Sequence, residues 1–238
     1  MVAVTVRVLT QLRRDPRTLA LIIGVPCLLE ALLKELFRGG PVFQHAGAPL
    51  LGLFPFVTMF LVTSITMLRE RTSGTLERLM TMPLGKLDLL AGYGLAFALV
   101  AIAQAAIVSL LAFGALDLNV AGSPILVAAL AVANAVLGSA LGLFVSAFAQ
   151  SEFQAVQFMP AMVFPQILLS GLFVGRDQMA TWLRWTSDAL PLTYAYDALA
   201  HTASDTLGTR FAVDVIVVCG CIVFALAFGA VTLRRRTD

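Results

Sequence analysis

The sequence predicts an all-α integral membrane protein that crosses the bilayer six times. Of its 238 residues, 59% are hydrophobic and 13% are charged, against roughly 45–50% and about 25% in soluble domains. Five stretches contain no Asp, Glu, Lys or Arg: 39–68, 89–116, 118–151, 153–175 and 215–233. They lack the alternation of a barrel strand, which leaves helices as the spanning structure. This composition excludes a disordered chain, a disulfide-stapled secreted domain and a typical cytosolic enzyme.

We predict transmembrane helices at about 18–37, 49–68, 89–113, 124–148, 154–174 and 212–233, since a bilayer requires about 17–25 residues. The first span is apolar for most of its length but carries Glu30, Lys34 and Glu35. We expect Glu30 to pair with Lys34, because Glu before Lys at i, i+4 is the favourable order on a helix. The outer end of this span would then be neutralised internally.

Basic residues orient the predicted spans. With the N-terminus inside, the inner segments hold 11 of the 16 Lys and Arg residues, as the excess of positive charge on cytoplasmic loops requires. We therefore expect both termini in the cytoplasm and a multi-pass protein of a bacterial cytoplasmic membrane. The basic residues would face anionic lipid and not nucleic acid.

The first 14 residues predict an amphipathic helix on the inner membrane surface. Its apolar face is Val4, Val8, Leu9 and Leu12, and its polar face includes Arg7, Gln11 and Arg14. Two interpretations stay open: an anchor that sets topology, or a lever that contacts a cytoplasmic partner.

The inner loop 69–86 is densely charged between two apolar spans and predicts a short docking helix. Leu76, Leu79 and Met80 follow helical spacing, Glu77 lies in the first turn, and Pro83 ends the helix. The alternative is a solvated loop whose charges only set topology. The separation of an apolar from a charged face favours docking.

The segment 69–84, R-E-R-T-S-G-T-L-E-R-L-M-T-M-P-L, resembles the membrane subunits of type II ABC exporters, especially drug-resistance and antibiotic-efflux permeases. A P-x-x-x-x-S-G-L-F run at 165–173 and a Leu-Pro-Leu-Thr-Tyr run at 190–194 agree with that family. The resemblance covers essentially the whole chain and implies one transmembrane domain, 1–238. It also implies a cytoplasmic coupling helix that contacts an ATPase subunit, with coupling residues Arg69, Glu70, Arg71, Gly74, Thr75, Leu76, Glu77, Arg78, Leu79 and Pro83.

The outer segment 176–210 contains both tryptophans and predicts two short helices at the outer boundary. The resemblance implies that such re-entrant helices close the outer end of a path, with gate residues Ser170, Gly171, Trp182, Pro191 and Tyr194. It places spans two and five at the path, which would make Phe54, Phe56, Phe60, Phe158 and Phe164 lining residues. Anchoring without gating, and phenylalanines that only pack or face lipid, are the alternatives.

Uncharged polar and small residues within the spans allow several roles. Gln104 and Asn134 either line a path or form interhelical hydrogen bonds, and Gly138-x-x-x-Gly142 allows close helix packing.

No Gly-x-x-x-x-Gly-Lys-[Ser/Thr] phosphate loop occurs in the sequence, and His45 and His201 have no metal-ligand cluster around them. The chain is therefore expected not to be an enzyme and to carry no cofactor of its own. The leading hypothesis is an exporter permease that pairs with a second permease, the same or related, and with ATPase subunits that bind ATP and Mg. Its cargo would be amphipathic, drug-like or lipid-like. The alternatives are a proton-coupled drug antiporter that uses Glu30, and a membrane scaffold without a transport cycle.

Overall fold

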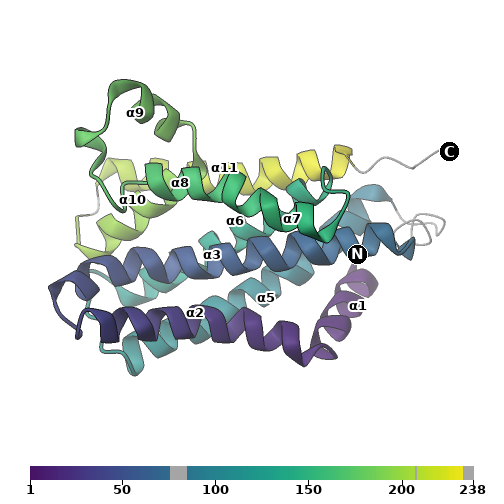
Figure 1. The fold of residues 1–238 in the computed structure, drawn as a ribbon, viewed down its shortest axis with the longest axis horizontal. Coiled ribbons are helices and arrows are strands. Elements are labelled where there is room, and N and C mark those ends of the chain that lie inside the picture. Colours follow the sequence, from purple (N-terminus) through teal and green to yellow (C-terminus); the bar gives the residue numbers. More distant parts are fainter. Residues whose placement is uncertain (76–84, 207, 233–238) are drawn as a thin grey trace.

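The computed structural model describes residues 1–75, 85–206 and 208–232, and every regular element in these ranges is a helix. The elements are α1 Val2–Arg13, α2 Pro16–Leu36, α3 Pro41–Thr72, α5 Lys86–Gly114, α6 Pro124–Ser146, α7 Glu152–Phe158, the π-helical η1 Met159–Val163, α8 Phe164–Leu169, the 3-10 helix η2 Arg176–Gln178, α9 Thr181–Asp188, α10 Pro191–Ala203 and α11 Thr209–Thr232. The long helices lie side by side as a bundle (Figure 1).

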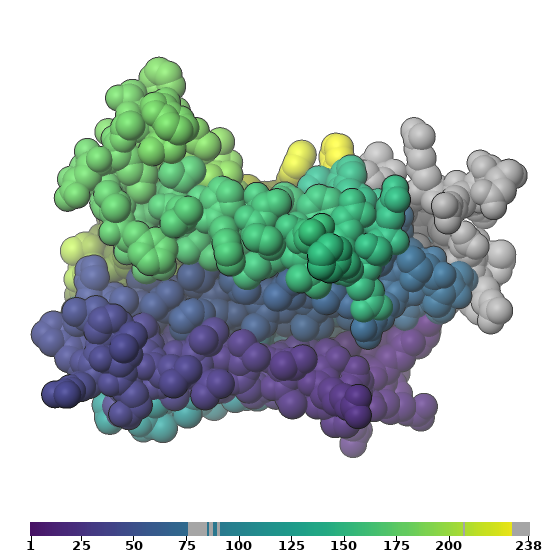
Figure 2. Space-filling view, in the orientation of Figure 1, coloured from purple at the N-terminus to yellow at the C-terminus, as the bar shows by residue number. Residues whose placement is uncertain are grey.

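Figure 1 places α1, the end of α3 and α7 at one end of the bundle, the α1 end, and α9 and α10 at the other, the α9 end. The segment that contains α9 protrudes from the bundle (Figure 2). Of the two short helices predicted in 176–210, α9 lies in this protruding part and α10 packs in the bundle against α3, α6 and α11. Their place at an outer membrane boundary stays a prediction.

Among the described residues, four helices are long and apolar enough to cross a membrane: Pro41–Thr72, Ala91–Gly114, Pro124–Ser146 and Thr209–Gly229. The first predicted span forms the 21-residue helix α2, which carries charges near both ends. The fifth predicted span is not one α-helix, because it divides into α7, η1 and α8 at Pro160 and Pro165. Proline lacks the amide hydrogen that a continuous helix needs. The count of six spans stays a prediction.

Helices α3 and α6 form the centre of the bundle. One apolar cluster joins them to α1, α2 and α5, and a second joins them to η1, α10 and α11. Gly138 and Gly142 lie directly against α3, where an added Cβ would come within 2.2 Å of the Phe56 carbonyl oxygen and 2.5 Å of that of Phe60. The predicted small-residue motif therefore brings the two central helices of one chain together.

Gln104 compensates for a proline in α2. Pro26 lacks the N–H that would bond to the Ile22 carbonyl one turn earlier. The Gln104 side-chain nitrogen donates to that carbonyl at 2.6 Å and lies 2.6 Å from the Thr58 hydroxyl. Of the two roles open to Gln104, the structure shows the interhelical hydrogen bond.

The apolar face of α1 packs on the bundle. Val4, Val8 and Leu12 are 2–6% exposed, and the Thr5 hydroxyl donates to the Gly92 carbonyl of α5 at 3.0 Å. An added Cβ at Gly92 would lie 2.8 Å from that of Val4, so the glycine allows this contact. In this structure the predicted apolar face is occupied by protein, and its placement at a lipid surface stays a prediction.

Candidate functional site

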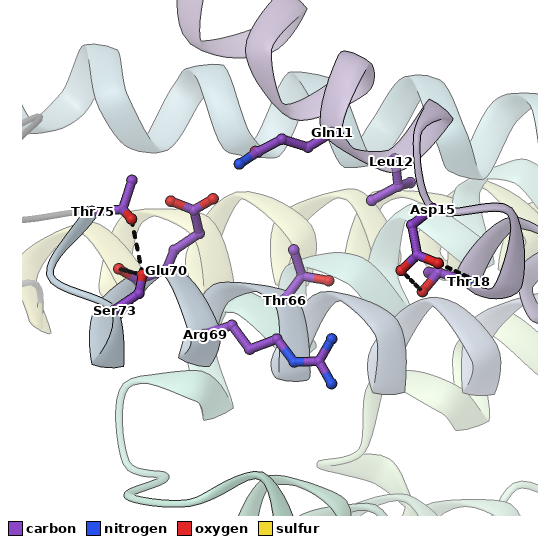
Figure 3. Close-up of a pocket in the computed structure, with 9 residues that line it drawn as sticks. All are labelled: Gln11, Leu12, Asp15, Thr18, Thr66, Arg69, Glu70, Ser73 and Thr75. Carbon is purple, nitrogen blue, oxygen red and sulfur yellow. Dashed lines mark hydrogen bonds between the residues drawn. The ribbon is translucent and has the colours of Figure 1, made fainter.

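The α1 end contains a cavity of about 320 Å³ between α1, the start of α2 and the last turns of α3 (Figure 3). Gln11 and Leu12 of α1 lie across it from Thr66 and Glu70 of α3. The full lining is Gln11, Leu12, Asp15, Thr18, Thr66, Arg69, Glu70, Ser73 and Thr75. The lining therefore includes Arg69, Glu70 and Thr75, three of the predicted coupling residues.

Asp15 fixes the start of α2 beside this cavity. Its carboxylate accepts hydrogen bonds from the Thr18 backbone at 3.2 Å and the Thr18 hydroxyl at 2.6 Å. These bonds lower the pKa of Asp15 below its ordinary value. Since Pro16 follows it, α2 begins with an N-cap and a proline in its first helical turn.

Glu70 is the buried centre of the site. Its residue is 7% exposed, and its Oε2 accepts from Arg7 Nη2 at 2.7 Å and from the Tyr93 hydroxyl at 3.0 Å. Arg7 also donates to the Tyr93 oxygen at 2.5 Å. Charge-assisted bonds of this kind are stronger than neutral ones. They tie the end of α3 to both α1 and α5.

The residues on either side of Glu70 reach two further helices. Arg69 binds Glu152 of α7 with two parallel bonds of 2.8 and 2.9 Å, which lower the pKa of Glu152. Arg71 donates to the Ser146 carbonyl at the end of α6. We call the consecutive residues Arg69, Glu70 and Arg71 the α3 hub, because together they contact α1, α5, α6 and α7.

The α3 hub accounts for three of the predicted coupling residues. Gly74 adopts φ 71° just after the Ser73 cap of α3, a conformation in which glycine commonly ends a helix. The Thr75 hydroxyl lies 2.9 Å from that of Ser73. The remaining predicted coupling residues, Leu76, Glu77, Arg78, Leu79 and Pro83, lie outside the described residues. The coupling role stays a prediction for all of them.

The five phenylalanines predicted to line a path have different environments. Phe56 and Phe60 are fully buried, in a cluster that includes Leu137 and Val163. Phe54 and Phe158 are half-buried, and Phe164 is 49% exposed. Two of the five therefore pack inside a single chain in this conformation. Their role as lining residues stays a prediction.

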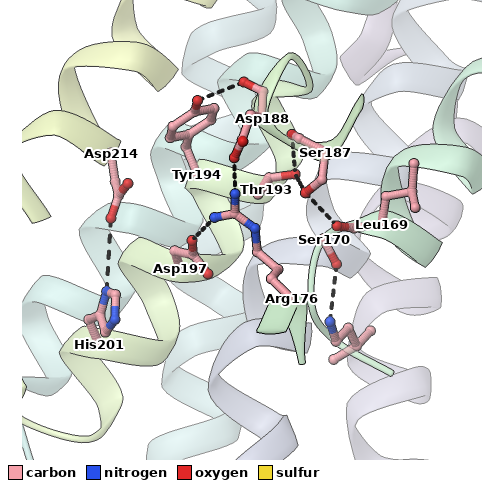
Figure 4. Close-up of polar contacts among 11 residues, drawn as sticks. Leu169, Ser170, Arg176, Ser187, Asp188, Thr193, Tyr194, Asp197, His201 and Asp214 are labelled. Carbon is pink, nitrogen blue, oxygen red and sulfur yellow. Dashed lines mark hydrogen bonds and ion pairs between the residues drawn. The ribbon is translucent and has the colours of Figure 1, made fainter. Parts of the chain in front are cut away.

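The predicted outer gate residues lie in and around a polar network at the α9 end (Figure 4). The Tyr194 hydroxyl donates to the Asp188 carbonyl at 2.6 Å, and Pro191 begins α10. The Ser170 hydroxyl donates to the Ile167 carbonyl at 2.8 Å. Gly171 has φ 102°, and an added Cβ there would lie 3.2 Å from the Tyr196 ring. Trp182 is 66% exposed on α9.

Arg176 is the centre of this network, and sequence reasoning missed it. Its guanidinium binds Asp188 of α9 and, at 3.0 Å, Asp197 of α10. Burial raises the pKa of Asp197 above its ordinary value. The signal was available, because 176–210 is the longest charged segment outside the predicted spans. The sequence did not indicate which of these charged residues would form ion pairs.

The expected pairing of Glu30 with Lys34 is wrong. The Lys34 ammonium lies 3.1 Å from the Asp117 carboxylate and 3.4 Å from the Ala115 carbonyl. Glu30 is fully buried, and neither of its carboxylate oxygens has a hydrogen-bond partner in the described part of the chain. Lys34 turns away because the loop after α5 offers two acceptors.

Comparison with known proteins gives the family of this architecture. The family described as ABC-2 type transporter matches residues 1–203. The chain is 24% identical over 187 residues to ABC transporter G family member 20 of Dictyostelium discoideum, covering 77% of this chain and 26% of that protein.

A second similar protein is the probable multidrug ABC transporter permease YbhR of Escherichia coli (strain K12). The identity is 30% over 135 residues, covering 57% of this chain and 37% of that protein. In both comparisons the chain spans less than half the length of the relative. The family match nevertheless covers most of the present chain. The chain therefore belongs to the ABC-2 type transporter family.

Proposed function

We propose that this chain is the permease subunit of an ATP-driven ABC exporter in a cell membrane. Family membership supports this assignment, and the α3 hub is the single structural observation that carries it. A motor that acts on the segment after α3 would act first on residues that bind four other helices. The family match does not favour proton antiport through Glu30, and we do not propose it.

In this mechanism the segment 76–84 contacts a cytoplasmic ATPase, and the α3 hub distributes its motion. Glu70 passes displacement to α1 and α5 through Arg7 and Tyr93, at bond lengths of 2.7 and 3.0 Å. Arg69 passes it to α7 and Arg71 to α6. Because the Glu70 carboxylate is buried, its bonds are weakly screened by solvent. The end of α3 and its neighbours would therefore move together.

The complete exporter would contain two permease chains, the same or related, with an ATPase subunit under each. ATP and Mg would bind to those ATPases, which supply the energy that this chain is not expected to generate. The cargo we propose is an amphipathic, drug-like or lipid-like molecule moved outward. The word multidrug in the name of the Escherichia coli relative supports this class of cargo.

The test is Glu70→Gln in the permease assembled with its ATPase in lipid vesicles. The amide keeps the size of the side chain but removes the charge that holds Arg7. We expect ATP hydrolysis to continue while transport per ATP falls about tenfold, the scale of a typical coupling free energy. Cargo uptake into inverted vesicles and phosphate release are measured on the same sample.

Glu35→Gln is the matched control, since Glu35 is an exposed glutamate of α2 towards the α9 end. It should leave both rates unchanged. Charge reversal at Glu77 should uncouple in the same way as Glu70→Gln, because it acts on the predicted docking face. If the Glu70 variant assembles and transports normally, the hub does not transmit the motion.

A further inference from the structure

A second cavity, of about 720 Å³, lies at the α9 end. We call it the outer basin. Its charged lining consists of four aspartates and three arginines, with one histidine: Asp177, Asp188, Asp197, Asp214, Arg176, Arg184, Arg210 and His201. With a neutral histidine, these formal charges sum to one negative charge. The remaining lining includes Tyr194, Tyr196 and Val213, which give the basin an apolar part.

One carboxylate oxygen of Asp214, Oδ2, has no hydrogen-bond donor among the described residues of this basin. The side chain of Asp214 is only 8% exposed. The nearest basic atom is His201 Nδ1 at 3.9 Å, which is beyond hydrogen-bond distance. A buried acceptor left without a donor destabilises the protein by the lost hydration of that group, and more so when the group is charged. Binding of a hydrogen-bond donor from outside this network would therefore be favourable at Asp214.

The arginines of the basin do not supply that donor. Arg176 is held by Asp188 and Asp197 (Figure 4). Arg210 is exposed one turn before Asp214 on α11 and forms no ion pair with it in the described structure. None of the three arginines forms an ion pair with Asp214 in the described structure, so a cationic ligand would meet a carboxylate whose one nearby base is His201, at 3.9 Å and charged only when protonated.

We propose that the outer basin binds the ammonium group of an amphiphilic primary amine, with Asp214 as its acceptor. A primary ammonium supplies both the missing positive charge and the missing N–H donor. A quaternary ammonium supplies only the charge. The apolar chain of the ligand would lie against Val213 and the two tyrosines, where the polar basin meets the apolar part of α11. This inference deepens the proposed function, because it names a cargo class at the outer end of the proposed path.

Equilibrium binding of radiolabelled octylamine to the protein in lipid nanodiscs tests the proposal, with empty nanodiscs subtracted. Binding needs neither ATP nor the ATPase, so a failure here is distinct from a failure of coupling. We expect Asp214→Asn to weaken binding about tenfold or more, as the loss of one partner of a buried charge pair does. Asp177→Asn removes the same formal charge from an exposed lining residue. It should change the affinity less than about twofold, as expected for a charge on the rim.

Competition in the unmodified protein provides a second test that does not depend on folding of the variant. Unlabelled octylamine should displace the probe, whereas octyltrimethylammonium should do so about tenfold less well, because it lacks the N–H donor. Equal competition by the two compounds, or equal loss in both aspartate variants, would overturn the proposal.

Nanodiscs of phosphatidylethanolamine and phosphatidylcholine distinguish two sources of the amine. Weaker probe binding in phosphatidylethanolamine assigns the site to an amine-bearing lipid headgroup. Equal binding in both lipids assigns it to a free amphiphilic amine.

Discussion

The two ends of the bundle are held by ion pairs of different reach. At the α1 end the α3 hub binds residues 63 to 83 positions away in the sequence, except for the bond from Tyr93 to Glu70, which spans 23. At the α9 end the contacts of Arg176 span 12 and 21 positions. Lys34 with Asp117 is the longer exception at that end. The polar contacts at the α1 end therefore join helices from across the chain, while the ion pairs of Arg176 stay within 176–197.

This difference suggests different mechanical roles. A displacement at the α3 hub cannot occur without moving α1, α5, α6 or α7. The ion pairs of Arg176 join only neighbouring parts of 176–197, so their loss leaves the pairs at the α1 end intact. Polar contacts that join many helices at the α1 end, and only neighbouring segments at the α9 end, fit a transport subunit that is driven from the α1 end.

The largest effect on stability is expected at the contact between α3 and α6, the two central helices on which both ends of the bundle pack. Gly138→Ala places a methyl group 2.2 Å from the Phe56 carbonyl oxygen, which cannot be relieved by a side-chain rotation. We expect a loss of about 3 kcal/mol or more in unfolding free energy, at the upper range for overpacking. Unfolding in mixed micelles measures it.

Gly220→Ala is the matched control for Gly138→Ala, because nothing lies within 4 Å of an added Cβ at Gly220 in α11. That variant should be neutral or slightly more stable, since alanine is a better helix former than glycine. A Gly138 variant as stable as the control would mean that α3 and α6 can separate without cost.

The next prediction compares Arg7→Met with Arg176→Met. Arg7→Met leaves Glu70 buried with Tyr93 as its one remaining described donor, at a cost of about 2–3 kcal/mol. Arg176→Met should cost about 1 kcal/mol and act locally. Hydrogen exchange followed by mass spectrometry measures both. The Arg7 variant should expose peptides of α1, α5 and the end of α3 together, and the Arg176 variant only peptides of 176–201. The same exchange pattern in both variants would remove the distinction between the two ends.

The smallest expected effect is an opposite response to acid. The bonds from Arg69 lower the pKa of Glu152 below its ordinary 4.5, so the stability they add is present above 4.5 and lost as the pH falls through the lowered value. Burial raises the pKa of Asp197 above its ordinary 3.8. Its effect has the other sign: stability is greatest below 3.8 and is lost as the pH rises through the raised value.

Peptide exchange rates of α7 and α10, corrected for the intrinsic effect of pH, should therefore change in opposite directions on acidification. The Arg69–Glu152 ion pair contributes at most about 1 kcal/mol to the stability of α7, because both side chains are exposed. Glu152→Gln and Asp197→Asn should each abolish the response at their own helix and leave the other unchanged. A response that survives its own substitution would belong to another group.

Sequence reasoning predicted most of the helices because local periodicity and charge-free length identify them. It placed α1 as an amphipathic helix and two short helices after the fifth predicted span. It did not predict the division of that span into α7, η1 and α8. Pro160 and Pro165 are visible in the sequence, but whether a proline bends, widens or ends a helix depends on what packs around it.

The sequence by itself determined the helical class, the family and the position of the coupling candidates, because these depend on residues close together along the chain. Only the tertiary structure decided that Glu70 meets Arg7, that Lys34 leaves Glu30 for Asp117, and that Asp214 Oδ2 lies buried without a hydrogen-bond partner among the described residues. Charges more than one helical turn apart choose partners according to how helices pack. In this chain that packing is set by α3 and α6, whose contact depends on Gly138 and Gly142, neither of which is next to any of those charges in the sequence.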